Sequence, residues 1–337
     1  MSKQTTFDQF YTIKNKKKNI FYIDWNHQNP KAIWLIEKPL STTFEANVKW
    51  KDVGTQVTIC CTDYIEKNTG IPSETNYANI SLLKSHLQKC VRRQLTNKAL
   101  KTAWHLIKMD INAFIRRLPV IMLEDVHLHE SLSPIVWLIS AISKGYVIDH
   151  RQISWLLGVV SYMCETKQYD CLENNSVIGK KNIPQLIKNI NEHKHINDNQ
   201  KNMLYSLLFR VSYGGMKGDM NMFYNYTLQY LKSVETINMT SSIIPVDFTK
   251  IGSLNLDEIE IYSADFHCYP KIIENIVKKF PQYTNEQVKQ CLWDCNSKYN
   301  TRYSEEHSFT KTEITNMWEV IKSYVDSIQI GLIKTSH

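Results

Sequence analysis

The sequence predicts a mainly α fold with a small β-rich N-terminal unit (α+β). Two observations predict this class: β-forming residues alternate or cluster between 19 and 64, and helical periodicity follows from Ile80 onward. A third sets the size, since 337 residues that are 43% hydrophobic can bury one large core or two smaller ones. We expect a β-rich unit at 1–70, a helical core at 71–235 and a C-terminal helical region at 236–337.

Four segments of the N-terminal region predict strands. They read "NIFYIDW", "KAIWLIEK", "ANVKWKDV" and "TQVTICCTDYI", with Asn, Pro and Gly between them. Alternation of apolar and polar residues, bounded by turn residues, is typical of short half-buried strands. These segments indicate a small sheet.

The first predicted helix follows at Ile80. At about 100° per residue, one arc of this helix collects its apolar residues, which are Ile80, Leu83, Leu87, Cys90, Val91 and Leu95. Lys89, Arg92 and Arg93 fall on the opposite side. We therefore expect one face to enter the core and the other to form a basic ridge.

Further helices follow in order. "TNKALKTAWHLI" predicts a helix with Thr96 as its N-cap, and Asp110 is placed to cap the next, "INAFIRRL", before Pro119 kinks or restarts it. The polar segment at 165–200 predicts a long loop or a short helix, and 238–258 a linker. "PKIIENIVKKF", "NEQVKQCLWDCNSKYN" and "KTEITNMWEVIKSYVDSI" predict the C-terminal helices.

Positive charge is concentrated in one stretch. The formal net charge is +7, and 84–117 holds nine basic residues against the single acid Asp110. Localised positive charge attracts polyanions, which favours a nucleic-acid interface. The candidate contacts are Lys89, Arg92, Arg93, Lys98, Lys101, Arg116 and Arg117. The alternative is that these residues only solvate helix surfaces, although such surfaces usually mix both signs of charge.

The order "LLKSHLQKCVR", "KALKTAWHLIKMD", "FIRRLPVIMLEDV" resembles the helical region behind the ATPase module in the family of replication-associated recombination protein A and Werner-helicase-interacting protein. These are clamp-loader-related AAA+ proteins. The matching positions, within about sixty residues (80–140), are Lys89, Arg92, Ala99, Leu100, Arg116, Arg117, Glu124, Asp125 and Val126. The resemblance implies a collar-like oligomerisation module beside DNA. The chain has no G-x-x-x-x-G-K-[ST] loop, so ATPase activity does not carry over.

A glycine-rich loop is a candidate phosphate site. "SYGGMKGDM" places Gly214, Gly215, Lys217 and Gly218 between two predicted helices. Backbone amides at the start of the second helix, together with Lys217, can cradle a phosphate. The alternative is a tight helix–helix turn with a glycine C-cap.

"EDVHLHE" groups histidines with carboxylates, a combination that can bind a transition metal. A helix would direct His127 and His129 apart. The preferred interpretation is a helix end at which Glu124 and Asp125 form ion pairs with Arg116 or Arg117, and we expect no metal.

Asp265 and His267 in "SADFHCYP" are the candidate acid or base of an enzyme. Cys268 adjoins His267, but neighbours in sequence do not form a catalytic dyad. The alternative is a capping Asp and a satisfied interior His. No motif in the sequence defines a reaction, so an enzyme is the less favoured class.

Several classes of protein are excluded. No stretch approaches the ~20 apolar residues of a membrane span, and the N-terminal residues lack the apolar core of a secretion signal. The eight cysteines form no CxxC pair, which indicates reduced, mostly buried thiols. We expect an intracellular protein, in the nucleus or at a site of DNA replication, without a cofactor. The Lys- and Asn-rich composition is similar to that of proteins encoded by AT-rich genomes, such as those of large DNA viruses.

Two hypotheses follow. The first is a non-enzymatic, homo-oligomeric protein of a replication or repair machinery that binds nucleic acid, DNA rather than RNA, and contacts replication proteins. The second is an enzyme acting on a nucleotide or nucleic acid, with the phosphate held at 214–218.

Overall fold

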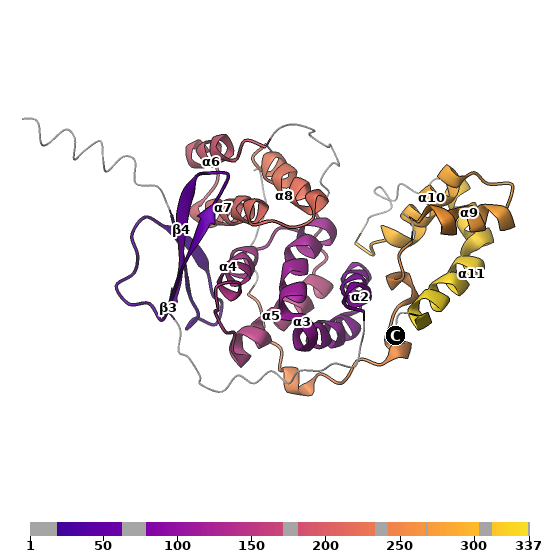
Figure 1. Cartoon of the computed structure of the whole chain (residues 1–337), viewed down its shortest axis with the longest axis horizontal. Coiled ribbons are helices and arrows are strands. Elements are labelled where there is room, and N and C mark those ends of the chain that lie inside the picture. Colours follow the sequence, from indigo (N-terminus) through magenta and orange to yellow (C-terminus); the bar gives the residue numbers. More distant parts are fainter. Residues whose placement is uncertain are drawn as a thin grey trace, which may run out of the picture. The chain divides into compact units, whose positions relative to one another are not determined.

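The computed structural model describes residues 19–62, 79–170, 181–232, 242–266, 269–302 and 312–335. Ten α-helices and a four-stranded sheet lie in these residues, which confirms the predicted fold class (Figure 1). The described residues fall into two compact units. Unit 1 holds 19–62, 128–149 and 181–232, and unit 2 holds 79–127, 150–170 and the described residues from 243 onward.

The units are interleaved, and so differ from the three contiguous regions that the sequence predicts. The predicted core at 71–235 is divided between both units. The β-rich segment is not a unit by itself, because the apolar face of a four-stranded sheet must be covered by other elements to be stable. Helices from 128–149 and 181–232 share its unit.

The sheet of unit 1 contains the four predicted strands. They are β1 (Ile20–Asp24), β2 (Ala32–Leu35), β3 (Phe44–Trp50) and β4 (Thr55–Thr62). The strand order is β2-β1-β4-β3; β1 runs parallel to β4, and the two outer pairs are antiparallel.

The helices of unit 1 are α4 (Leu132–Ile142), α6 (Ile183–Glu192), α7 (Asp198–Tyr213) and α8 (Lys217–Tyr230). Trp34 on β2 stacks on Phe21 with 4.4 Å between ring centroids. Its indole Nε1 donates to Ser206 Oγ on α7 at 3.1 Å, and Trp137 Nε1 on α4 donates to Phe21 O at 3.0 Å. Aromatic packing and these hydrogen bonds attach α4 and α7 to the sheet.

In unit 2, α2 (Ile80–Arg92), α3 (Thr96–Asp125) and α5 (His150–Glu165) pack together. Asp110 interrupts α3, with φ −157° and ψ 92°, and its Oδ1 accepts from Ala113 N at 3.0 Å. The predicted cap is therefore confirmed, and the break lies at Asp110 rather than at Pro119. Thr96 is the first residue of α3 and not its cap, since the N-cap Leu95 offers no side-chain acceptor.

The segment 243–266, called the strap below, continues unit 2. It contains three single 3₁₀ turns, η1 (Phe248–Lys250), η2 (Leu256–Glu258) and η3 (Ile261–Ser263). Val246 N donates to Ser154 O of α5 at 2.9 Å, and η3 contacts both α2 and α11. The predicted linker around 238–258 is mostly exposed over its described residues, although Ile243 and Leu254 are buried and Val246 attaches it to α5.

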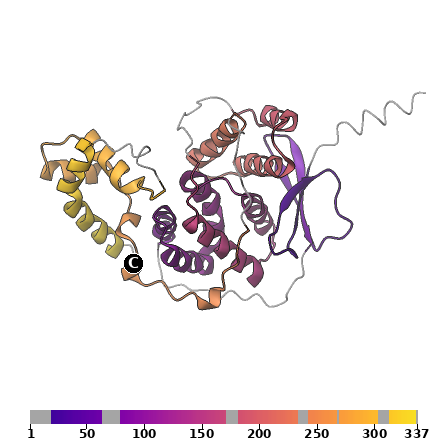
Figure 2. The same cartoon turned by 180° about the vertical axis from the view of Figure 1, so that it is seen from behind.

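The predicted C-terminal helices are present as α9 (Pro270–Lys279), α10 (Asn285–Leu292), a π-helical turn η4 (Trp293–Ser297) and α11 (Thr312–Thr335). Figure 2 shows them as an orange and yellow bundle. Ile276, Val288 and Ile321 are buried at its centre.

The sequence predicts neither a membrane span nor a disulfide framework, and the described residues bear on both predictions. No helix among them has the length and hydropathy needed to cross a membrane. Among the described cysteines, none forms a disulfide; Cys295 is half-buried and the others, Cys60, Cys61, Cys90, Cys164 and Cys291, are buried.

Candidate functional site

Lys89 and Arg92 of α2 are only 3% and 5% exposed, so the predicted exposed ridge is wrong for these two residues. Lys89 Nζ donates to Ser297 O at 2.6 Å and forms an ion pair with Asp265 Oδ2 at 3.2 Å. The pKa of Lys89 is lowered to about 8, mainly by burial and also by the nearby Arg92, while Asp265 opposes the shift.

Arg92 is held by three partners. It pairs with Glu124 Oε1 at 2.7 Å and with Asp125, and it donates to Ser297 O. Burial raises the pKa of Asp125 to about 6, against the effect of Arg92. The two carboxylates at the end of α3 therefore pair with Arg92, and not with Arg116 or Arg117 as the sequence predicts.

The other five predicted nucleic-acid contacts are all half-buried. The Arg93 guanidinium lies 4.1 Å from the centroid of the Tyr262 ring. Lys98 pairs with Glu260 at 2.5 Å, and Lys101 with Glu258 at 2.6 Å. Arg117 Nη2 donates to Gln88, whose own amide donates to both carboxylates at the end of α3, and Arg116 is half-buried.

The strap explains why no ridge forms. It supplies Glu258, Glu260 and Asp265 to basic side chains that precede it by about 160 or more residues. Isolated charges are costly to bury, and partners with opposite charge offset that cost. None of the nine basic residues of 84–117 is exposed. The acids of 257–265 are the sequence feature from which this pairing could have been predicted.

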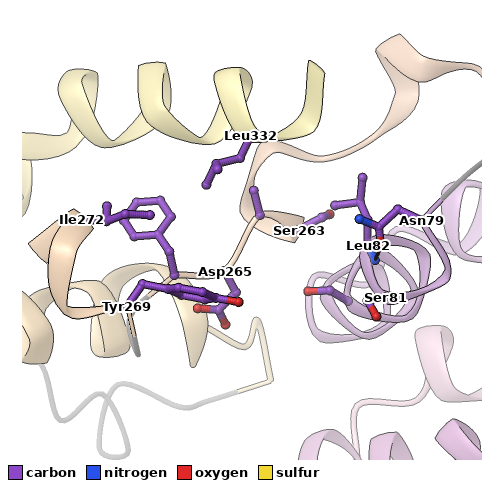
Figure 3. Close-up of a pocket in the computed structure, with 11 residues that line it drawn as sticks. Asn79, Ser81, Leu82, Ser263, Asp265, Tyr269, Ile272 and Leu332 are labelled. Atoms are coloured by element: carbon purple, nitrogen blue, oxygen red, sulfur yellow. Dashed lines mark hydrogen bonds between the residues drawn. The ribbon is translucent and has the colours of Figure 1, made fainter. Parts of the chain in front are cut away.

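The second feature of this region is a cavity of about 360 Å³, called the α2–strap pocket below. The start of α2 contributes Asn79, Ser81 and Leu82, the strap contributes Ser263, and α11 contributes Leu332 (Figure 3). Asn79 Oδ1 caps α2 by accepting from Leu82 N at 3.0 Å, which fixes this wall of the pocket.

Two polar groups of the strap line the pocket. Ser263 is 3% exposed, and its hydroxyl has no hydrogen-bond partner among the described residues. Asp265 keeps 24% of its side chain exposed, while its Oδ1 accepts from Ser297 Oγ at 2.8 Å. The predicted candidate Asp265 therefore lies in a cavity, held in place by Ser297 and Lys89. His267 lies outside the described residues.

The rest of the lining is largely apolar and aromatic. Phe266 is buried, Ile272 of α9 is half-buried, and Tyr269 is exposed. A mixed lining with a few converging polar groups is typical of a small-molecule site. The sequence did not indicate Asn79, Ser263 or Tyr269, because only the tertiary fold brings their segments together.

The glycine loop belongs to unit 1. Gly214 ends α7 with φ +93°, a conformation that glycine adopts readily. A Cβ on Gly215 would meet Met220 Cε at 2.9 Å. Both observations fit a tight helix–helix turn with a glycine C-cap, which is the alternative to a phosphate site. Lys217 and Gly218 are exposed at the start of α8, and phosphate binding here stays a prediction.

The predicted histidine group is dispersed. His127 Nε2 lies 2.7 Å from Tyr162 Oη, and His129 Nδ1 lies 2.9 Å from Ser131 Oγ. Among the described residues, no three His, Cys, Asp or Glu side chains are grouped in a way that could hold a metal ion.

No family model, curated protein or solved structure matches this chain. The resemblance of 80–140 to the clamp-loader-related family therefore stays a prediction.

Proposed function

We propose that this protein binds a small organic molecule in the α2–strap pocket. The observation that carries the proposal is the cavity itself, in which the partly exposed carboxylate of Asp265 is held in place among largely apolar side chains. The volume of about 360 Å³ falls in the range of small-molecule sites.

Hydrogen bonds hold parts of the pocket lining in fixed positions, which favours recognition of a specific ligand. Asp265 is held by Lys89 and Ser297, so its carboxylate keeps one orientation when a ligand arrives. Gln329 Nε2 of α11 donates to Ala264 O at 3.0 Å and fixes the adjoining backbone of the strap. Preorganised groups lose little entropy on binding.

The test is a fragment screen by thermal shift with two tryptophan variants of α11. Leu332→Trp fills the pocket, whereas Ile330→Trp is a matched control at an exposed position outside it. At ten times Kd, a ligand adds ~1.4 kcal/mol of stability. We expect the parent and Ile330→Trp, but not Leu332→Trp, to be stabilised. No stabilising fragment, or equal binding by both variants, would contradict the proposal.

Nucleic-acid binding is the second candidate, favoured by the net charge of +7. Lys89 and Arg92 are buried in ion pairs, so contacts would come from the half-buried Arg93, Arg116 and Arg117 or from exposed lysines such as Lys49 and Lys217. Affinity for DNA and RNA at about 50 and 200 mM salt tests this, because phosphate contacts weaken steeply with salt. Salt-independent affinity would exclude it. Homo-oligomerisation, replication partners and a nuclear location are proposals that depend on this candidate.

A further inference from the structure

We propose that the ligand of the α2–strap pocket is an organic ammonium, that is, a protonated primary amine attached to an apolar group. This inference deepens the proposed function and rests on it. Asp265 is the one charged residue among those that line the pocket. A carboxylate accepts hydrogen bonds only, so the group it selects is a donor.

Hydroxyl groups in the pocket lining also favour a ligand that donates hydrogen bonds. Ser81 and Ser85 line the pocket along with Asp265, and a hydroxyl oxygen can accept from an ammonium. The ammonium carries three N–H donors, one for the carboxylate and the others for hydroxyl oxygens. The Tyr269 ring also lines the pocket, and an aromatic face adds about 0.5–2 kcal/mol of attraction for a cation.

An anionic ligand, including a nucleotide phosphate, is disfavoured by the same geometry. The ion pair with Lys89 offsets part of the charge of Asp265, but the described lining offers an anion a carboxylate and hydroxyl groups and no cation. Lys89 is not part of the lining, and its ammonium is bonded to Asp265 and to Ser297 O. The positive N-terminus of α2 would favour an anion by only about 0.3–1 kcal/mol. The carboxylate of Asp265 therefore determines which charge on the ligand is preferred, and it favours a cation.

The apolar walls select the rest of the ligand. The pocket is also lined by four apolar side chains, Leu82, Phe266, Ile272 and Leu332. Asp265 is the one charged residue in the described part of the lining. Burying apolar surface of the ligand against the apolar side chains contributes about 25 cal/mol per Å². An aryl or alkyl substituent on the amine satisfies this part of the lining.

The experiment compares three probes that share a phenyl group: phenethylamine, 2-phenylethanol and phenylacetate. Affinities for the full chain are measured by calorimetry near pH 7, where the amine is protonated. We expect phenethylamine to bind about tenfold more tightly than the alcohol and phenylacetate to bind more weakly than both, as the charge of Asp265 requires. Equal affinities, or tightest binding of the alcohol or acid, would overturn the ammonium proposal but keep the pocket. Binding of none of the three, with no fragment hit, would overturn the proposed function too.

A variant pair assigns the preference to the carboxylate. In Asp265→Asn, the amine and the alcohol should bind within about twofold of each other. Glu319→Gln is the matched control, because it removes one negative charge from an exposed position on α11 outside the pocket. An amine preference that persists in Asp265→Asn would contradict the inference. If Asp265→Asn does not fold, the comparison of the three probes on the parent chain still decides the question.

Discussion

α2 and α9 carry similar patterns of apolar and basic residues, but their basic side chains have opposite environments. In α9, Ile273 and Ile276 are buried while Lys271, Lys278 and Lys279 are exposed, as helical periodicity predicts. In α2, Lys89 and Arg92 are buried like Leu83 and Leu87 of the apolar face, and Lys84 is half-buried. The difference lies in the strap, η4 and the end of α3, which bring acids and a carbonyl group to α2.

The comparison shows what helical periodicity can predict. The spacing of apolar residues identifies the face of a helix that enters the core, but it does not show what covers the opposite face. Sequence separation adds to this limit, since Lys89 and Ser297 lie 208 residues apart. A local count of charges therefore does not identify a surface patch.

The largest expected effect comes from Arg92→Met. This change leaves Asp125 and Glu124 without their cation in a buried site, which typically costs about 3–5 kcal/mol. Lys278→Met on α9 is the matched control, and an exposed lysine there should change stability by less than about 0.5 kcal/mol. Urea denaturation measures both. A small effect of Arg92→Met would mean that water reaches this ion pair.

A second effect of about 3 kcal/mol depends on pH. Burial lowers the pKa of His86 to about 4 in the folded chain, below the ~6.5 of an unfolded one. As pH falls from about 6.5 to 4, the unfolded chain binds this proton first, so the free energy of unfolding decreases. Asp125, with a folded pKa of about 6, has the opposite effect, because the folded chain binds that proton first between about pH 6 and 4.

The two contributions can be separated with variants. The unfolding free energy of His86→Gln should rise from pH 6 to 4.5, and that of Asp125→Asn should fall more steeply than in the parent. Urea titrations at several pH values measure both slopes. Parallel slopes in the parent and both variants would mean that neither group titrates in this window.

The smallest expected effect tests the strap directly. Lys98→Glu with Lys101→Glu replaces two partly buried ion pairs by repulsion from Glu260 and Glu258, at a cost of about 2 kcal/mol. Adding Glu258→Lys and Glu260→Lys restores opposite charges and should recover most of that loss. Lys271→Glu with Lys278→Glu on α9 is the control and should stay within about 0.5 kcal/mol. Failure of the swapped charges to rescue would show that these contacts contribute little.

The sequence predicted the features whose determinants are local. Four strands follow from alternation and turn residues, and Asp110 caps the second half of α3 as predicted. The site could not be predicted in the same way. Asp265 was chosen for its chemistry, but Ser263 and Asn79 acquire their role only when α2 and the strap meet. No periodicity within either segment encodes that meeting.

The 208 residues between Lys89 and Ser297 also affect synthesis. At about 5–20 residues per second, a ribosome needs roughly 10–40 s to extend the nascent chain from α2 to η4. Throughout that interval the basic side chains of α2 have none of the partners that the strap and η4 later supply. Contacts of such long sequence range also slow folding. Arg92 gains acidic partners early, because the two carboxylates at the end of α3 follow it by only 32 and 33 residues. Lys89 has to wait for Asp265 and Ser297, so the two neighbouring basic side chains of α2 are neutralised at different stages of synthesis.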